Sequence, residues 1–217
     1  TISGTYTTNT TINIVSVASA GTPSCINPQT SSTTLTILPL PTASVAVSPT
    51  TICANSSATF TFTGTPNATV TYNINGGATQ TVTLNASGTA TISGTYTTNT
   101  TINIVSVASA GTPSCINPQT SSTTLTILPL PTASVAVSPT TICANSSATF
   151  TFTGTPNATV TYNINGGANQ TVTLNASGTA TISGTYTTNT TINIVSVASA
   201  GTPSCINPQT SSTTLTI

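Results

Sequence analysis

The sequence contains no Lys, Arg, Asp, Glu or His in 217 residues. A typical globular domain is about a quarter charged. General acid–base catalysis depends on side chains that titrate near neutral pH, and the only titratable side chains here, Tyr and Cys, ionise well above neutrality when unperturbed. Without His or carboxylates, the chain also lacks the usual ligands of catalytic zinc and of calcium. The sequence therefore predicts a protein that is not an enzyme and that holds no cofactor or metal.

The absence of cations also argues against two classes of partner. Binding to nucleic acid relies on Lys and Arg to neutralise phosphates, and electrostatic docking to an anionic membrane relies on the same residues. Unbroken apolar runs are short, such as the four residues 37–40 (ILPL), whereas a spanning helix needs about 20 predominantly apolar residues. We predict neither a nucleic-acid partner nor insertion into a membrane.

What the sequence does contain is an internal repeat. The segment Thr1–Tyr6 (TISGTY) returns at Thr91 and again at Thr181, which is a period of 90 residues. Every residue of the first 127 recurs 90 positions later with one exception, because Thr79 corresponds to Asn169. Such a period indicates tandem copies of one structural unit.

Two proline-rich segments, 38–41 and 128–131 (both LPLP), divide the chain into its units. Proline fixes φ and lacks an N–H, so a strand normally stops there. We predict full repeats at 38–127 and 128–217. Residues 1–37 are interpreted as the C-terminal part of an earlier repeat, comprising its last three strands, whose front lies outside this sequence.

Within 38–127 apolar residues alternate with Thr, Ser and Asn, which predicts half-buried strands. The apolar residues of the seven predicted strands are Ala43, Val45 and Val47; Phe60 and Phe62; Val70, Tyr72 and Ile74; Val82 and Leu84; Ala90 and Ile92; Ile102, Ile104, Val105 and Val107; Leu125 and Ile127. The alternation slips between Ile104 and Val105, which predicts a β-bulge. Seven short strands in about 90 residues are typical of an antiparallel immunoglobulin-like β-sandwich. The predicted fold class is all-β, with tandem seven-stranded sandwiches of 90 residues.

Several stretches of one repeat resemble a known family. They are 41–44 (PTAS), 51–58 (TICANSSA), 62–72 (FTGTPNATVTY), 84–90 (LNASGTA) and 105–109 (VSVAS), the last followed by Cys115. Together they resemble the tandem immunoglobulin-like repeats of Bacteroidota (flavobacterial) surface proteins, and the resemblance covers the whole chain. It implies a very long secreted protein, exported by the type IX system, that serves as a surface adhesin or filament. The chain departs from the family in its zero charge and in Ile102, where a Tyr is common.

The five cysteines are Cys25, Cys53, Cys115, Cys143 and Cys205. None has the CxxC spacing of a metal site, and no base is present to activate a nucleophilic thiol. Disulfides in an extracellular setting are therefore expected.

Two disulfide pairings are open. One lies within each repeat and joins Cys53 to Cys115 and Cys143 to Cys205. However, Cys53 precedes the second predicted strand and Cys115 follows the sixth, and these strands run in the same direction. The two cysteines then lie at opposite poles of a sandwich, whereas a disulfide needs Cα atoms about 4.4–6.8 Å apart. The other pairing joins Cys53 to Cys205 across adjacent repeats, with Cys25, Cys115 and Cys143 paired outside this sequence.

Asn-x-Ser/Thr triplets make candidate glycosylation sites, and sugar would solubilise an uncharged surface. They lie at Asn9, Asn55, Asn67, Asn85, Asn99, Asn145, Asn157, Asn169, Asn175 and Asn189. A chain this rich in Thr, Ser and Asn also produces such triplets by chance, so both interpretations stay open.

Two functions are compatible with these features. The first is a structural extracellular repeat protein that forms a cell-surface filament or adhesin shaft, with repeats stiffened by Pro linkers and disulfides. Its partners are neighbouring repeats or other copies, since low net charge promotes association. The alternative is an array of carbohydrate-binding modules that contact surface glycans. Only the loops 64–67 (GTPN) and 111–114 (GTPS) offer a site for that function.

Overall fold

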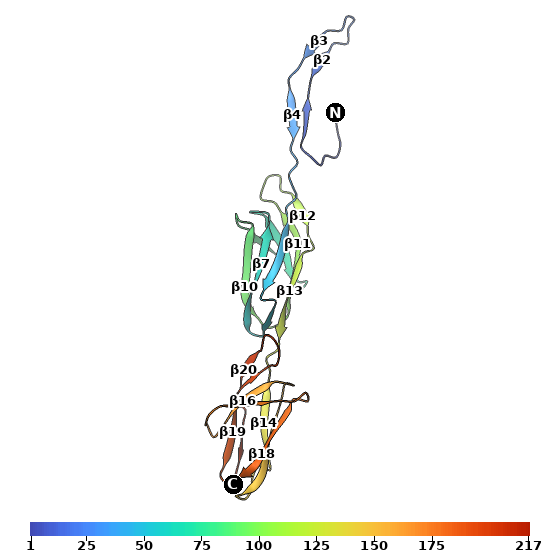
Figure 1. Cartoon of the computed structure of the whole chain (residues 1–217). Coiled ribbons are helices and arrows are strands. Elements are labelled where there is room, and N and C mark those ends of the chain that lie inside the picture. Colours follow the sequence, from blue (N-terminus) through green and yellow to red (C-terminus); the bar gives the residue numbers. More distant parts are fainter.

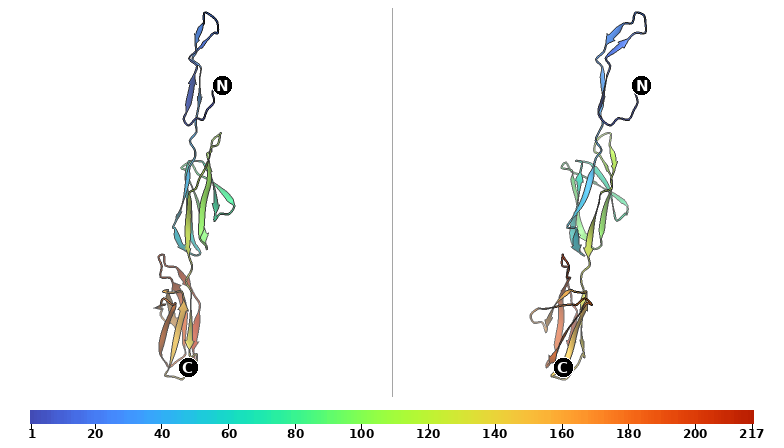
Figure 2. Two further views of the ribbon diagram at one scale, coloured as in Figure 1. Left: turned by 90° about the vertical axis from the view of Figure 1, so that its right-hand side faces the viewer. Right: turned by 45° about the vertical axis from the view of Figure 1, so that its right-hand side comes forward.

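The computed structural model describes all 217 residues. Three bodies, 1–37, 38–127 and 128–217, are stacked end to end as a rod (Figure 1). Figure 2 shows the same extended shape from two further sides. All secondary structure is strand, in agreement with the predicted all-β fold. No helix in the structure is long and apolar enough to cross a lipid bilayer.

The body 38–127 is a sandwich of two sheets. The first sheet has the strand order β10-β7-β5, made of β5 (Ala43–Ser48), β7 (Ser56–Gly64) and β10 (Thr89–Tyr96). The second has the order β6-β13-β11-β8-β9, with β12 also on β11, and is made of β6 (Thr51–Cys53), β8 (Thr69–Ile74), β9 (Thr79–Thr83), β11 (Thr100–Ala108), β12 (Ile116–Pro118) and β13 (Ser122–Leu128). The predicted bulge is confirmed, because the β11–β8 register shifts between Ile104 and Ser106.

The structure adds two short strands, β6 and β12, to the seven that were predicted. The predicted first strand corresponds to β5 and ends before Pro49, and the added strand that follows joins the other sheet: β5 pairs antiparallel with β7, and β6 pairs parallel with β13. The expectation of a purely antiparallel sandwich is therefore wrong at β6. Proline cannot donate to a sheet ladder, so the chain leaves the first sheet there and crosses to the second.

The core lies between the two sheets and is built from the inward residues of the alternating pattern. Phe60 and Phe62 are completely buried. The ring of Phe62 lies 5.1 Å from that of Tyr72, and the ring of Phe60 lies 5.7 Å from that of Tyr96. Burying each such side chain contributes roughly 1.5–3 kcal/mol. The outward residues are mainly Thr, Ser and Asn, so the surface is polar without being charged.

The body 128–217 repeats this arrangement. Its strands are β14 (Ala133–Ser138), β15 (Ser146–Gly154), β16 (Thr159–Ile164), β17 (Gln170–Thr173), β18 (Thr179–Tyr186), β19 (Thr190–Ala198), β20 (Ile206–Pro208) and β21 (Ser212–Leu215). The counterpart of β6 is reduced to a single bridge between Thr141 and Thr216. In the preceding body, β6 pairs with β13 as far as Leu128, the first residue of the next repeat. Leu128, the first residue of the next repeat, thus completes the β6–β13 pair of the body 38–127.

The body 1–37 contains β1 (Thr10–Asn13), β2 (Ser16–Ala18), β3 (Ile26–Pro28) and β4 (Ser32–Leu35). Their pairing copies that of β11, β12 and β13, so that Thr10 faces Leu35 as Thr100 faces Leu125. Residues 1–6 form no strand. Their counterpart, 91–96, pairs with β7, and 1–37 contains no copy of that strand.

Candidate functional site: the junction between repeats

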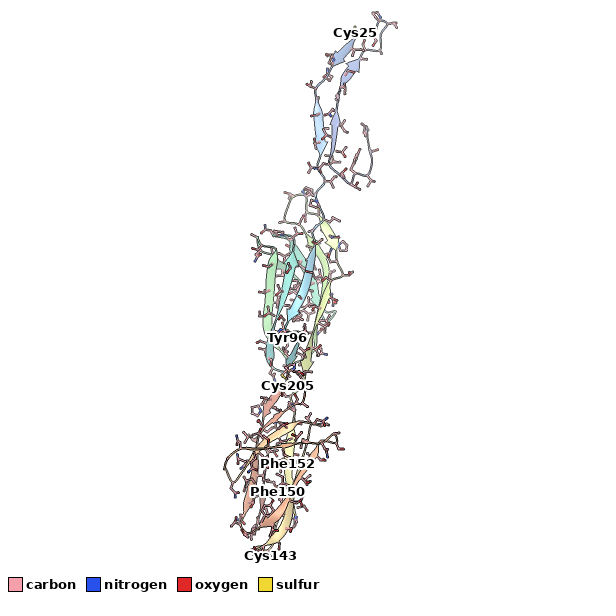
Figure 3. All side chains as sticks on the ribbon, viewed as in Figure 1. Cys25, Tyr96, Cys143, Phe150, Phe152 and Cys205 are labelled. Carbon is pink, nitrogen blue, oxygen red and sulfur yellow. A yellow bond between two sulfur atoms is a disulfide. The ribbon has the colours of Figure 1, made fainter.

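A disulfide crosses the boundary between the two full repeats. It joins Cys53, at the end of β6, to Cys205, in the loop before β20, with Cα atoms 5.5 Å apart and a sequence separation of 152. Figure 3 places Cys205 at the boundary and Cys143 at the opposite end of the same body. The structure thus forms the second of the two pairings considered above. The pairing within repeats is not formed, because the two cysteines of a repeat lie at opposite poles of the sandwich.

The loop that carries Cys205 is closed by its own hydrogen bonds. The amide N of Cys205 donates to Ser199 Oγ at 2.9 Å, and the amide N of Ser199 donates to the Cys205 carbonyl at 2.9 Å. Ser204 Oγ donates to the Ser199 carbonyl at 2.8 Å. The same backbone and side-chain bonds close the loop of Cys115, whose thiol is free. The loop therefore holds its cysteine in place without needing the disulfide.

On the other side, Cys53 is fixed to the strand that leads into the linker. In the parallel pair of β6 and β13 it lies opposite Leu128. The next amide, that of Ala54, donates to the Leu128 carbonyl at 2.9 Å. Asn55 then takes a φ of 67° and donates its amide to the Tyr96 carbonyl at 2.9 Å. This turn leaves the Cys53 side chain free to meet the next repeat.

The linker 128–131 is itself fixed at both ends. Its first carbonyl accepts the Ala54 bond just described, and its last carbonyl, that of Pro131, accepts a hydrogen bond from Asn207 Nδ2 at 2.9 Å. The preceding linker has the same arrangement, with Asn117 Nδ2 donating to the Pro41 carbonyl at 2.9 Å. Prolines at 129 and 131 restrict φ between these points. No pattern in the sequence pointed directly to this role of Asn207, which lies in no Asn-x-Ser/Thr triplet.

Two open grooves flank the junction. The first is lined by Pro49, Thr51, Ile52, Cys53, Ser56 and Ser57 from one repeat and by Pro203 from the next. The second is lined by the linker residues 128–131 together with Thr155, Ser199 and Gly201. The tip of the Cys205 loop therefore lies against the preceding repeat. The counterparts of both candidate carbohydrate-binding loops, 154–157 and 201–204, contribute residues to these contacts and lie at the junction.

The other predicted site residues are distributed along the rod. Cys25 and Cys143 are exposed, Cys115 is half-buried, and all three are free thiols.

The ten Asn of the Asn-x-Ser/Thr triplets are all exposed. Some of these amides also have a structural role that the triplets did not indicate. The Oδ1 of Asn99 accepts the Ile127 amide at 2.7 Å, next to the linker. The Oδ1 of Asn85 accepts the Ser87 amide at 2.9 Å and closes a turn.

The tyrosines are the side chains with shifted titration. Burial raises the pKa of Tyr72 and Tyr162 above the ordinary phenol value of 10.0. Burial also raises the pKa of Tyr96 and Tyr186, and the neighbouring buried tyrosine raises it further. The phenols are therefore neutral at physiological pH. None of the residues that connect the repeats carries a charge.

No family model and no curated protein matches the sequence. Among solved structures, the chain is similar to the Ca²⁺-stabilized adhesin with which an Antarctic bacterium binds ice, with a TM-score of 0.50 and 23% identity over 93% of this chain and 55% of that one. A 1.5-MDa bacterial ice-binding adhesin gives a TM-score of 0.45 and 20% identity over 87% and 70% of the two chains. The Yersinia pseudotuberculosis adhesin InvE gives 0.32 and 18% over 81% and 59%.

The chain thus spans about half the length of the first of these structures, 55%. The likeness to that structure shows the fold alone, an all-β, immunoglobulin-like sandwich.

Proposed function

We propose that this chain is a segment of an extracellular shaft, the stalk of a cell-surface adhesin or filament, whose repeats are held in line by proline linkers and inter-repeat disulfides. The observation that carries the proposal is the junction, where two covalent connections cross between the same two bodies. One is the linker 128–131, and the other is the Cys53–Cys205 disulfide. The repeats are nearly identical in sequence, so each one forms the same structure and none carries a distinct binding site of its own. Such uniform units are suited to a stalk.

Two covalent connections restrict bending more than one does. Bodies joined by a single linker can swing about it, and relative motion is the usual expectation for a small interface. A second connection at a different point of the junction opposes that swing. The hydrogen bond from Asn207 to the Pro131 carbonyl and the prolines of the linker reduce the remaining freedom.

The chemistry of the junction supports a stiffness that depends little on the medium. Salt screens interactions between exposed charges, and a calcium-stabilised junction needs carboxylates. The residues here form neutral hydrogen bonds and a covalent S–S bond instead. We infer that the shaft keeps its shape when calcium, salt or moderate pH changes. The uncharged surface also favours lateral association with other copies.

Disulfides persist outside reducing compartments, which supports an extracellular, cell-surface location. The resemblance to Bacteroidota surface repeats adds the proposal of export by the type IX system. Imaging of intact producing cells with an antibody against the repeat tests the location. Label along fibres on the cell surface supports it, and label confined to the cell interior contradicts it.

The stiffness is tested by electron microscopy of single molecules. We expect a narrow distribution of the angle between bodies 38–127 and 128–217 in the oxidised chain, and a broader one in the double variant Cys53→Ser, Cys205→Ser. The variant Cys143→Ser is the matched control, because it removes an exposed thiol that joins nothing in this chain. Equal distributions in the oxidised chain and the double variant would overturn the stiffening role.

A further inference from the structure

The disulfide shortens the covalent route through the rod. Residues 41–53 run from one pole of the middle repeat to the other, through β5 and β6. Pro41 lies at the pole of β12, where it accepts the Asn117 bond, and Cys53 lies at the junction. Residues 205–217 run the full length of the last repeat, from Cys205 at the boundary to the C-terminus at the far end of the rod (Figures 1 and 3). The S–S bond joins the end of the first segment to the start of the second.

We propose that this connection removes the greater part of both repeats from the covalent line that carries tension along the rod. The inference rests on the proposed shaft function. A pull on the two ends passes through 41–53, the two sulfur atoms and 205–217. Residues 54–204 form a closed loop beside this line, with a separation of 152 between the bonded cysteines. While the disulfide holds, tension reaches them only through the hydrogen bonds and packing that join them to the two loaded segments, as in the β5–β7 and β19–β21 pairs.

The two segments in the line have little slack. Each contains two strands, which are β5 with β6 and β20 with β21. Strands already rise about 3.3 Å per residue, close to the limit of an extended chain. Each segment of this length spans roughly 40 Å when fully extended, about the length of the sandwich that it crosses. The rod therefore resists lengthening through covalent bonds, and its sandwiches do not have to withstand the pull by their own stability.

The repeat extends this logic to a longer array. The free thiols of Cys115 and Cys143 stand at the same two positions as the bonded Cys205 and Cys53, one repeat away. The segment between them, 115–143, crosses one repeat through β12 and β13 and the next through β14. With the same pairing at every junction, such segments join end to end through disulfides along the whole shaft.

Single-molecule force spectroscopy on the 217-residue chain, held at its two termini, tests the proposal. To prevent alternative pairings, Cys25, Cys115 and Cys143 are replaced by Ser, which leaves Cys53 and Cys205 as the only pair. At about 3.3–3.6 Å per residue, the closed loop holds about 500 Å of chain. We expect the oxidised chain to reach its limit about 500 Å short of the same chain with Cys53→Ser and Cys205→Ser.

Adding dithiothreitol during the pull provides a second measurement on the same oxidised molecule, so the result does not depend on how a variant folds. We expect the missing length of about 500 Å to appear after the disulfide is reduced under load. An oxidised chain that extends as far as the double variant would overturn the proposal, as would a limit that reductant does not change. The extension measurement tests only the covalent line through the disulfide. The shaft function is tested separately by the antibody labelling of intact cells, so failure of one proposal can be told from failure of the other.

Discussion

Gly64 and Gly88 meet at the pole of the sandwich where the chain enters β5, next to Thr42 and Ala43. The Gly64 amide donates to the Gly88 carbonyl at 2.8 Å. A Cβ on Gly88 would lie 2.2 Å from the Gly64 carbonyl oxygen, and Gly88 has a φ of +74°. Both the close approach and the positive φ require glycine there.

We therefore predict that Gly88→Ala is much more destabilising than Gly76→Ala. Gly76 has nearly the same φ, +73°, but a Cβ there would meet nothing within 4 Å. The shared conformational penalty is roughly 1–2 kcal/mol, and overpacking adds roughly 1–3 kcal/mol at Gly88 alone. Urea denaturation of both variants measures the difference. Equal midpoints would contradict the contact.

A second prediction concerns the core. Phe62 is completely buried and packs on Tyr72, so we expect Phe62→Ala to lower the free energy of unfolding by about 3–5 kcal/mol. The neighbouring Thr63 faces solvent, and Thr63→Ala should stay within about 0.5 kcal/mol of the unaltered chain. Chemical denaturation followed by tyrosine fluorescence provides both values. A small loss at Phe62 would mean that the two sheets do not enclose it.

The pH dependence of stability follows from the tyrosines. Burial raises the pKa of Tyr72, Tyr96, Tyr162 and Tyr186 above the unfolded value. Their contribution is fully present below the unfolded phenol pKa of about 10 and is lost as the pH rises through the folded values, because only the unfolded state then ionises readily. We predict a thermal midpoint that is flat from about pH 4 to pH 9 and falls above pH 10.

Thermal scans across this pH range test the prediction in the chain with Cys25, Cys115 and Cys143 replaced by Ser, so that thiol exchange does not contribute. A midpoint that drops between pH 4 and pH 6, as in proteins stabilised by carboxylates, would argue against it.

The linker contact gives a fourth prediction. Asn207→Ala removes the hydrogen bond to the Pro131 carbonyl, and we expect it to widen the angular distribution between the two full repeats when Cys53 and Cys205 are also Ser. Asn117→Ala removes the matching bond to Pro41 at the other junction, so it should leave that angle unchanged. Single-particle images of both variants make the comparison. Equal widening by both variants would indicate a general loss of stability.

The alternation of apolar and polar residues was enough to predict much of the fold. It identified Phe60, Phe62 and Val107 as inward residues, and all three are completely buried. It also located the bulge after Ile104. These features follow from the period of two along a strand, which is a local property of the chain. The short strand β6 was missed because its pairing with β13 depends on residues far apart in sequence.

The sequence by itself determined the repeat, the absence of charge, the alternation that forms the two sheets and the number of cysteines. It left the cysteine pairing open, because spacing along a chain does not say which poles of two sandwiches face each other. Only the tertiary structure decided that Cys53 meets Cys205. It also assigned Asn207 to the Pro131 carbonyl and Asn99 to the Ile127 amide. The disulfide depends on how complete sandwiches stack, and the two amide contacts depend on how segments far apart in sequence fold together within one sandwich. Both are properties of the folded whole and are encoded in no local pattern.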